Sequence, residues 1–181
     1  NTHEESMAVY DGLVKNPPPG PIVPYNSPRP ELYSNGQKHK VVIVRTGNRQ
    51  LGINEGFRLI GGANPIVKDV KNEVIIKPNC NTDDPFPRNS HSETVRIIAQ
   101  NLIESGLPSD KICVGDASGR YRGLPTRNTI KEMGIKKVAD DLGIKVGYFE
   151  EEEWVTVKPP TASAWPDGVK IPKRIYEADR V

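Results

Sequence analysis

The sequence has little of what marks several large classes of protein. Its 181 residues include only two cysteines, Cys80 and Cys113, which are too few for a disulfide framework. No apolar run approaches the length of a membrane-spanning helix. Basic and acidic residues nearly balance, 25 against 23, and a net charge of +2 gives no reason to expect nucleic acid or an anionic membrane as a partner. The composition leaves the oligomeric state unknown.

Proline, by contrast, is abundant, and it divides the chain. Seven of the 17 prolines lie between residues 17 and 30, where they oppose helix formation and strand pairing. We therefore expect residues 1–39 to form an extended, Pro-rich arm and residues 40–181 to form an α/β domain. The apolar ending from Tyr176 to Val181 is typical of a fragment of a longer chain.

The start of the sequence leaves the compartment unknown. The first residue is Asn1 rather than methionine, which indicates that an upstream segment was removed. That segment is an export signal, a tag or a disordered stretch, so an exported and a cytoplasmic protein are both compatible with the sequence.

Short β-branched runs alternate with amphipathic segments after residue 40. The runs at Val41–Val44 and Val74–Ile76 have no polar alternation, as expected for parallel strands that are covered on both faces. We predict strands at about 41–45, 73–77, 111–114 and 145–149, with helices between them. The predicted fold is an α/β domain with a parallel, doubly wound, Rossmann-like sheet and helices on both faces.

The helix after residue 90 has the strongest sequence signals. Ser90 and Glu93 have the Ser-x-x-Glu spacing of a capping box, and Gly106 ends the segment. Between them, five apolar residues recur at helical spacing: Val95, Ile98, Ala99, Leu102 and Ile103. Further helices are predicted at 52–59, 125–133 and 135–142, and an antiparallel pair of strands at 155–157 and 169–171.

Taken in order, these segments resemble the uncharacterised family called domain of unknown function 362. The similarity covers roughly Lys40 to Val181, and the ordered set is more specific than any one piece. The matching pieces are Val74–Asn79, Ser90–Arg96, Val114–Gly119, Met133–Ile135, Glu152–Trp154, Ile171–Pro172 and Glu177–Asp179. The resemblance implies the family's α/β fold, but the family has no agreed activity.

Two departures from the family pattern limit what the resemblance implies. The family usually continues past Asp179 into a strand and a Pro-Lys-Leu-Lys-Thr-His-like segment, which this sequence lacks. Some members carry ferredoxin-like iron–sulfur modules, whereas this sequence has no cysteine cluster. We therefore expect no iron–sulfur cluster on this chain.

Polar residues follow the second predicted strand, where α/β sheets have their ligand crevice. Lys77 can reach an anionic ligand from the strand end, and Asn79 offers a donor and an acceptor in the same loop. His91, at a helix start that disfavours a positive ring, can exchange a proton or bind a metal. The alternatives are a lysine with its ammonium in water and a solvent-facing histidine.

The loop after the third predicted strand supplies a second set of polar groups. Asp116 leaves that strand at its carboxyl end, Ser118 adds a hydroxyl and Arg120 adds a bidentate donor, while Gly119 permits close backbone approach. We expect this loop to bind a phosphate or carboxylate, although it has neither a Walker sequence nor a dinucleotide fingerprint. The alternative is a tight turn in which Asp116 caps backbone N–H groups.

Three further features are weaker candidates. Cys80 would be a ligand or nucleophile only if its neighbours lowered the thiol pKa, and an inert thiol is the simpler interpretation. The acidic runs Asp83–Asp84 and Glu150–Glu153 can bind a hard cation, but such runs are usually solvated surface. Cys113, inside a predicted strand, is expected to lie in the core.

We therefore expect a domain that binds a small anionic molecule at the carboxyl ends of its strands, directly or through a divalent metal at Asp116 and His91. An enzymatic role is open, and the reaction type cannot be read from the sequence. The alternatives are a non-catalytic redox or iron–sulfur accessory protein, which the resemblance implies, and an exported structural or interaction protein. The predicted catalytic residues are Lys77, His91 and Asp116, and the predicted cofactor-binding residues are Asn79, Ser118, Gly119 and Arg120.

Overall fold

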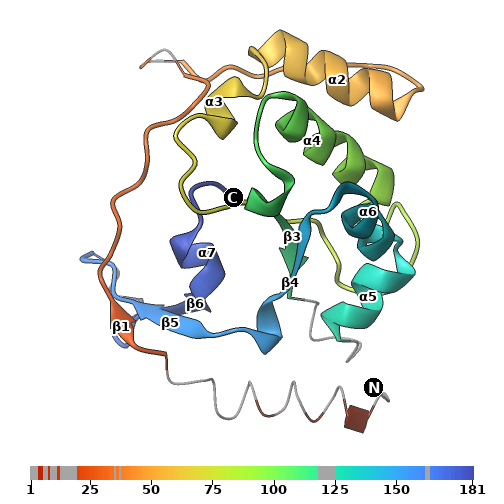
Figure 1. Ribbon diagram of the computed structural model, residues 1–181. Coiled ribbons are helices and arrows are strands. Elements are labelled where there is room, and N and C mark those ends of the chain that lie inside the picture. The colour runs from red at the N-terminus through yellow and green to blue at the C-terminus, as the bar shows by residue number, and fades with distance from the viewer. Residues whose placement is uncertain are drawn as a thin grey trace.

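A parallel three-stranded sheet lies at the centre of the protein, whose computed structural model is shown in Figure 1. The structure describes residues 20–34, 36, 38–117, 125–161 and 164–181, together with residues 4, 5, 8 and 12. The strands are β2 (Val74–Ile76), β3 (Ile112–Asp116) and β4 (Lys145–Tyr148), in that order across the sheet. They confirm the strands predicted near 73–77, 111–114 and 145–149, and their carboxyl ends lie at one edge of the sheet.

Helices connect these strands, as the alternation in the sequence predicts. The helix predictions at 52–59, after residue 90, at 125–133 and at 135–142 are confirmed. Gly134 and Gly143 bound the last of these with left-handed φ angles of 73° and 66°, which glycine adopts without strain. The helices are α2 (Arg49–Ile60), α3 (Asn64–Val67), α4 (Ser92–Glu104), α5 (Thr126–Glu132), α6 (Ile135–Leu142) and α7 (Lys173–Glu177). None of the helices in the described part of the chain is long and apolar enough to cross a bilayer.

Side chains that alternate along the strands pack into two separate clusters. Val74 and Ile112, which are paired in register, belong to a large apolar cluster that includes the buried faces of α4 and α6. Their successors Ile75 and Cys113 point the other way and pack with Phe149 and the end of α7. The central strands are therefore buried on both faces, which explains their unbroken apolar sequence.

The chain enters α4 differently from the prediction. The N-cap is His91, whose Nδ1 accepts the backbone N–H of Glu93 at 3.1 Å. The predicted capping box at Ser90 is wrong, because the Ser90 hydroxyl instead accepts the backbone N–H of Asn79 at 2.9 Å. Ser90 therefore ties the loop after β2 to the start of α4.

A second, smaller sheet contains part of the arm. The predicted antiparallel pair is confirmed as β5 (Trp154–Val157) and β6 (Val169–Pro172). Within the arm, β1 (Ile22–Val23) pairs in parallel with β5 (Figure 1). Pairing is possible there because neither residue is proline, and the arm thus lies against the domain at this point.

The predicted strand at 41–45 is wrong. In the structure this segment belongs to no strand, and Val41 and Ile43 are 78% and 90% exposed. The amino end of β2 takes the chain terminus as its neighbour instead: Val74 pairs with Arg180, whose carbonyl accepts the N–H of Ile75 at 2.9 Å. A β-branched run forms a strand only where an edge is free to receive it.

Candidate functional site

The carboxyl ends of β2 and β3 bring together two of the predicted site residues. Lys77 follows β2 and Asp116 ends β3, and Lys77 Nζ lies 2.7 Å from Asp116 Oδ1. The Asp116 side chain is only 3% exposed, whereas that of Lys77 is 52% exposed. The pair thus consists of a buried carboxylate that holds a half-exposed ammonium at the edge of the sheet.

Backbone N–H groups fix the position of the Asp116 carboxylate. Its Oδ2 accepts the N–H of Cys80 at 2.8 Å, and its Oδ1 accepts the N–H of Ala117 at 2.9 Å. The second contact is the turn cap that the sequence offered as an alternative, and here it coexists with the ion pair. An ammonium has three donors, so Lys77 keeps hydrogen-bonding capacity beyond its contact with Asp116.

Asn79 and Asn89 shape the loop between β2 and α4. Asn79 Nδ2 donates to the carbonyl of Arg88 at 3.1 Å, and its backbone N–H donates to Ser90. The buried Asn89 donates to the carbonyls of Thr82 and Asp84 and accepts the N–H of Asn81. Sequence analysis did not single out Asn89, since a lone asparagine in a polar loop carries no distinct signal.

His91 lies apart from the charge pair. Its ring packs edge-to-face on Phe86, with centroids 5.6 Å apart, and its Nδ1 is engaged as the helix cap, which leaves Nε2 for other contacts. It lines a cavity of about 350 Å³ together with Asp83, Glu132 and Met133. Neither Lys77 nor Asp116 lines that cavity, so the described residues do not bring His91 into the same site.

The two thiols are buried. Burial, together with the adjacent Asp116 carboxylate, raises the pKa of Cys80 to about 12 against the lowering effect of Lys77. Burial likewise raises the pKa of Cys113 to about 12, and this residue lies in the core as predicted. Cys80 is therefore a protonated thiol at neutral pH, and its backbone N–H rather than its sulfur contributes to the site.

Three predicted ligand-binding residues, Ser118, Gly119 and Arg120, lie outside the described residues. The described chain resumes at Pro125 and enters α5 at Thr126. Asp116 and Thr126 thus lie on either side of the stretch for which an anion-binding role is predicted.

Glu150 is a polar residue of this edge that sequence analysis undervalued. It lies in the short turn Phe149–Glu151 directly after β4, and it is 7% exposed. Its Oε1 accepts the backbone N–H of Thr126 at 2.7 Å, while its Oε2 is buried without a hydrogen-bond partner among the described residues. Burial raises the pKa of Glu150, against hydrogen bonds from Thr126. Its position directly after a predicted strand could have indicated a site residue, but the run of four glutamates indicated a solvated surface.

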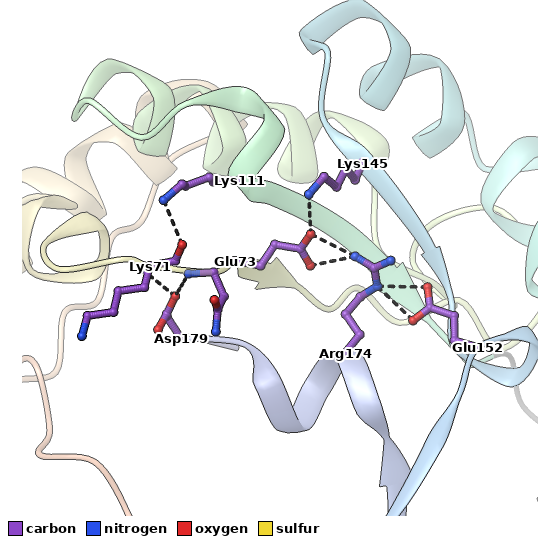
Figure 2. A network of polar contacts seen from close by, with 8 residues as sticks. Lys71, Glu73, Lys111, Lys145, Glu152, Arg174 and Asp179 are labelled. Carbon is purple, nitrogen blue, oxygen red and sulfur yellow. Dashed lines mark hydrogen bonds and ion pairs between the residues drawn. The ribbon is translucent and has the colours of Figure 1, made fainter. Parts of the chain in front are cut away.

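Another cavity lies beside the start of β2 and β4 and extends to Glu151–Glu153, which follow β4. It has a volume of about 890 Å³, and Figure 2 shows the charged network along it. Arg174 of α7 binds Glu73 at 2.8 Å and Glu152 at 2.9 Å, and Lys145 binds Glu73 at 2.8 Å. The lining has five glutamates against three basic residues, so its charge opposes an anionic ligand. We interpret it as a structural network that attaches α7 to the sheet.

The donor set at Asp116 suits a cation of the protein better than a metal ion. Both carboxylate oxygens already accept backbone N–H groups, and Oδ1 also binds Lys77. A divalent ion on that oxygen would displace the ammonium. The described residues contain no group of three histidine, cysteine or acidic side chains that could share such an ion.

These features define a mixed α/β domain whose parallel sheet carries, at its carboxyl edge, a buried carboxylate paired with a half-exposed ammonium. The chain belongs to the family described as Domain of unknown function (DUF362), whose model matches residues 74–181. That match confirms the resemblance read from the sequence. No curated protein and no solved structure matches the chain.

Proposed function

We propose that this domain binds a small oxyanion at the carboxyl edge of its parallel sheet, with Lys77 as the positive group that contacts the ligand. The observation that carries the proposal is the Lys77–Asp116 pair, in which the carboxylate is buried and the ammonium is half exposed. We also propose that the sheet is part of a doubly wound, Rossmann-like arrangement, in which ligands bind at this edge.

Asp116 prepares Lys77 for that role. Its carboxylate receives two backbone N–H groups and the ammonium, so the lysine is held at the rim rather than free in solvent. Holding a flexible side chain before binding reduces the entropy that the ligand must offset. A carboxylate or phosphate then adds a second negative partner to an ammonium with donors to spare.

The other predicted residues extend this site in the proposal. Ser118, Gly119 and Arg120 would contact the anion from the loop after β3, and Asn79 would support the facing loop. Lys77, His91 and Asp116 are the residues through which an enzymatic step on the ligand would run. A divalent metal at Asp116 and His91 is the less favoured form, because it requires loss of the Lys77 contact.

Isothermal titration with succinate and with inorganic phosphate tests the proposal. We expect Lys77→Met to weaken binding about tenfold or more, since a hydrogen bond to a charged group contributes roughly 1.5–3 kcal/mol. Asp116→Asn should weaken it less, because the lysine remains but is no longer held. Lys136→Met is the matched control, since Lys136 is an exposed lysine of α6 that pairs with Asp140.

The outcomes separate the possible sites. Equal affinity of wild type and Lys77→Met, or no binding of either anion, would refute the proposal. Repeating the titration after chelation and again with added Mg²⁺ distinguishes the metal form: binding that requires Mg²⁺ and survives Lys77→Met would favour a metal at Asp116.

A further inference from the structure

Glu150 lies at the same edge of the sheet as the Lys77–Asp116 pair. Tyr148 ends β4 and is the register partner of Asp116, and Glu150 follows it by two residues. Neighbouring strands are about 4.8 Å apart. The Lys77 ammonium contacts Asp116 and therefore lies at the end of β3. Glu150 therefore follows the strand that neighbours β3, and β3 ends at Asp116.

One oxygen of this carboxyl is bound and the other is not. Oε1 accepts the N–H of Thr126, where the chain enters α5, at 2.7 Å. Oε2 is buried and has no hydrogen-bond partner among the described residues. Glu150 as a whole is only 7% exposed. Buried polar atoms are nearly always paired, so the unpaired Oε2 has capacity to accept or share a hydrogen bond with a bound molecule.

In the described part of the chain, the basic residue beside Thr126 binds another glutamate rather than Glu150. Arg127, next to Thr126 on α5, binds Glu151 at 2.7 Å and stacks over the ring of Tyr148 at 4.2 Å. Burial raises the pKa of Glu150, hydrogen bonds from Thr126 oppose this, and the charge of Glu151 adds to the rise. A further negative charge brought close to this carboxyl favours its protonated form still more.

We propose that Glu150 contacts the bound anion through Oε2 and takes up one proton from solvent when the anion binds. This inference rests on the anion site proposed above and deepens it. The protonated carboxyl donates its O–H to one oxygen of the ligand, while Lys77 contacts a second oxygen of the same ligand. The ligand class is therefore an oxyanion with two separated acceptor oxygens, such as a dicarboxylate or a phosphorylated carboxylic acid.

Proton uptake can be measured directly. Succinate is titrated into the full chain at about pH 6.5 in two buffers with different ionisation enthalpies, since the difference in apparent binding enthalpy gives the protons exchanged. The variants are Glu150→Gln, which keeps an acceptor for Thr126, and Glu151→Gln, which is the matched neighbour. His91→Gln tests the histidine of α4's N-cap as another source of uptake.

We expect uptake approaching one proton per site in wild type, Glu151→Gln and His91→Gln, and none in Glu150→Gln. We expect Glu150→Gln to change affinity less than threefold, because an amide N–H replaces the O–H. The infrared spectrum of the wild type gives a second measurement that needs no variant: a carboxylic-acid band should grow as succinate is added.

Failure of this inference is distinguishable from failure of the proposed function. Succinate binding that depends on Lys77 but involves no proton uptake, or uptake that persists in Glu150→Gln, would overturn the role of Glu150 and leave the anion site in place. Absence of succinate binding in the wild type would overturn both.

Discussion

Replacing Arg174 by methionine tests how the protein attaches its last helix to the sheet. Arg174 reaches from α7 to Glu73, which precedes β2, and binds both of its carboxylate oxygens at 2.8 and 2.9 Å. It also binds both oxygens of Glu152 (Figure 2). Methionine keeps most of the aliphatic volume of the side chain but removes every one of these bonds, so Lys145 becomes the remaining cation of the network that contacts Glu73.

The expected loss of stability follows from the burial of the partners. Removing one member of a fully buried ion pair costs roughly 3–5 kcal/mol. The Arg174 side chain is 30% exposed and that of Glu73 is 11% exposed, and Lys145 retains its own contact, so we reduce the estimate to about 2–3 kcal/mol. For a chain of this length, that corresponds to a fall in Tm of about 4–12 °C.

Urea unfolding of wild type and three variants, Arg174→Met, Lys173→Met and Arg174→Lys, measures the effect. Lys173→Met is the matched control, because its neighbouring ion pair with Glu153 is exposed and should contribute less than about 1 kcal/mol. A loss of stability in Arg174→Met no larger than that of Lys173→Met would refute the reasoning, and so would full rescue by the non-bidentate Arg174→Lys.

The pH dependence gives an independent check on the same network. Burial alone would raise the pKa of Glu73, but hydrogen bonds from Lys145 and Arg174 outweigh it, and the net pKa is lowered. A lowered carboxyl pKa stabilises the fold above the unfolded-state value of about 4.3, and that contribution is lost as the pH falls through the folded-state value. The stability difference between wild type and Arg174→Met should therefore shrink as the solution is acidified below about pH 4.

Two further predictions concern the core of the same domain. Burial raises the pKa of Cys80 and of Cys113 to about 12. Both thiols should therefore fail to react with a thiol-specific reagent in the native protein and should react in urea. Rapid labelling of the native protein would contradict their burial. Gly115→Ala should destabilise the protein by about 1–3 kcal/mol, because the added Cβ would lie 2.8 Å from the ring of Phe149. Gly56→Ala should stabilise it by up to about 1 kcal/mol, because nothing lies within 4 Å of the added Cβ on helix α2. Thermal unfolding that ranks the two variants the other way would contradict this packing.

Much of the fold was predictable, because the central elements carry local signals that agree with their tertiary contacts. β2 is an unbroken β-branched run and is buried on both faces, as such a run predicts. The apolar stripe of α4 faces the core, and glycines with left-handed φ bound α6. Local propensity and packing point to the same answer in these elements.

The errors occurred where distant parts of the chain decide the structure. Val41–Val44 has the same β-branched character as β2, yet Arg180, far away in sequence, pairs with the amino end of β2 instead. Ser90 has good capping spacing, but its hydroxyl binds Asn79, and His91 becomes the cap. Local patterns do not reveal such competition for a strand edge or a hydroxyl.

The candidate site was only partly readable for a similar reason. Parallel strands place their carboxyl ends at one edge, which makes the meeting of Lys77 and Asp116 a reasonable expectation from sequence. The depth of each residue is set by packing, so the burial of Asp116 and the separate position of His91 could not be predicted. Glu150 was obscured by the charge of the three glutamates that follow it.

Amide chemical-shift mapping during a succinate titration tests the anion site most directly. A ligand on Lys77 should weaken its contact with Asp116 and shift the amides of Cys80 and Ala117, which donate to that carboxylate. The amides of Lys71 and Asn72, which donate to Asp179 at the other edge, serve as an internal reference and should not move. Shifts confined to Lys71 and Asn72, or no shift at Cys80 and Ala117 under saturating succinate, would contradict the account.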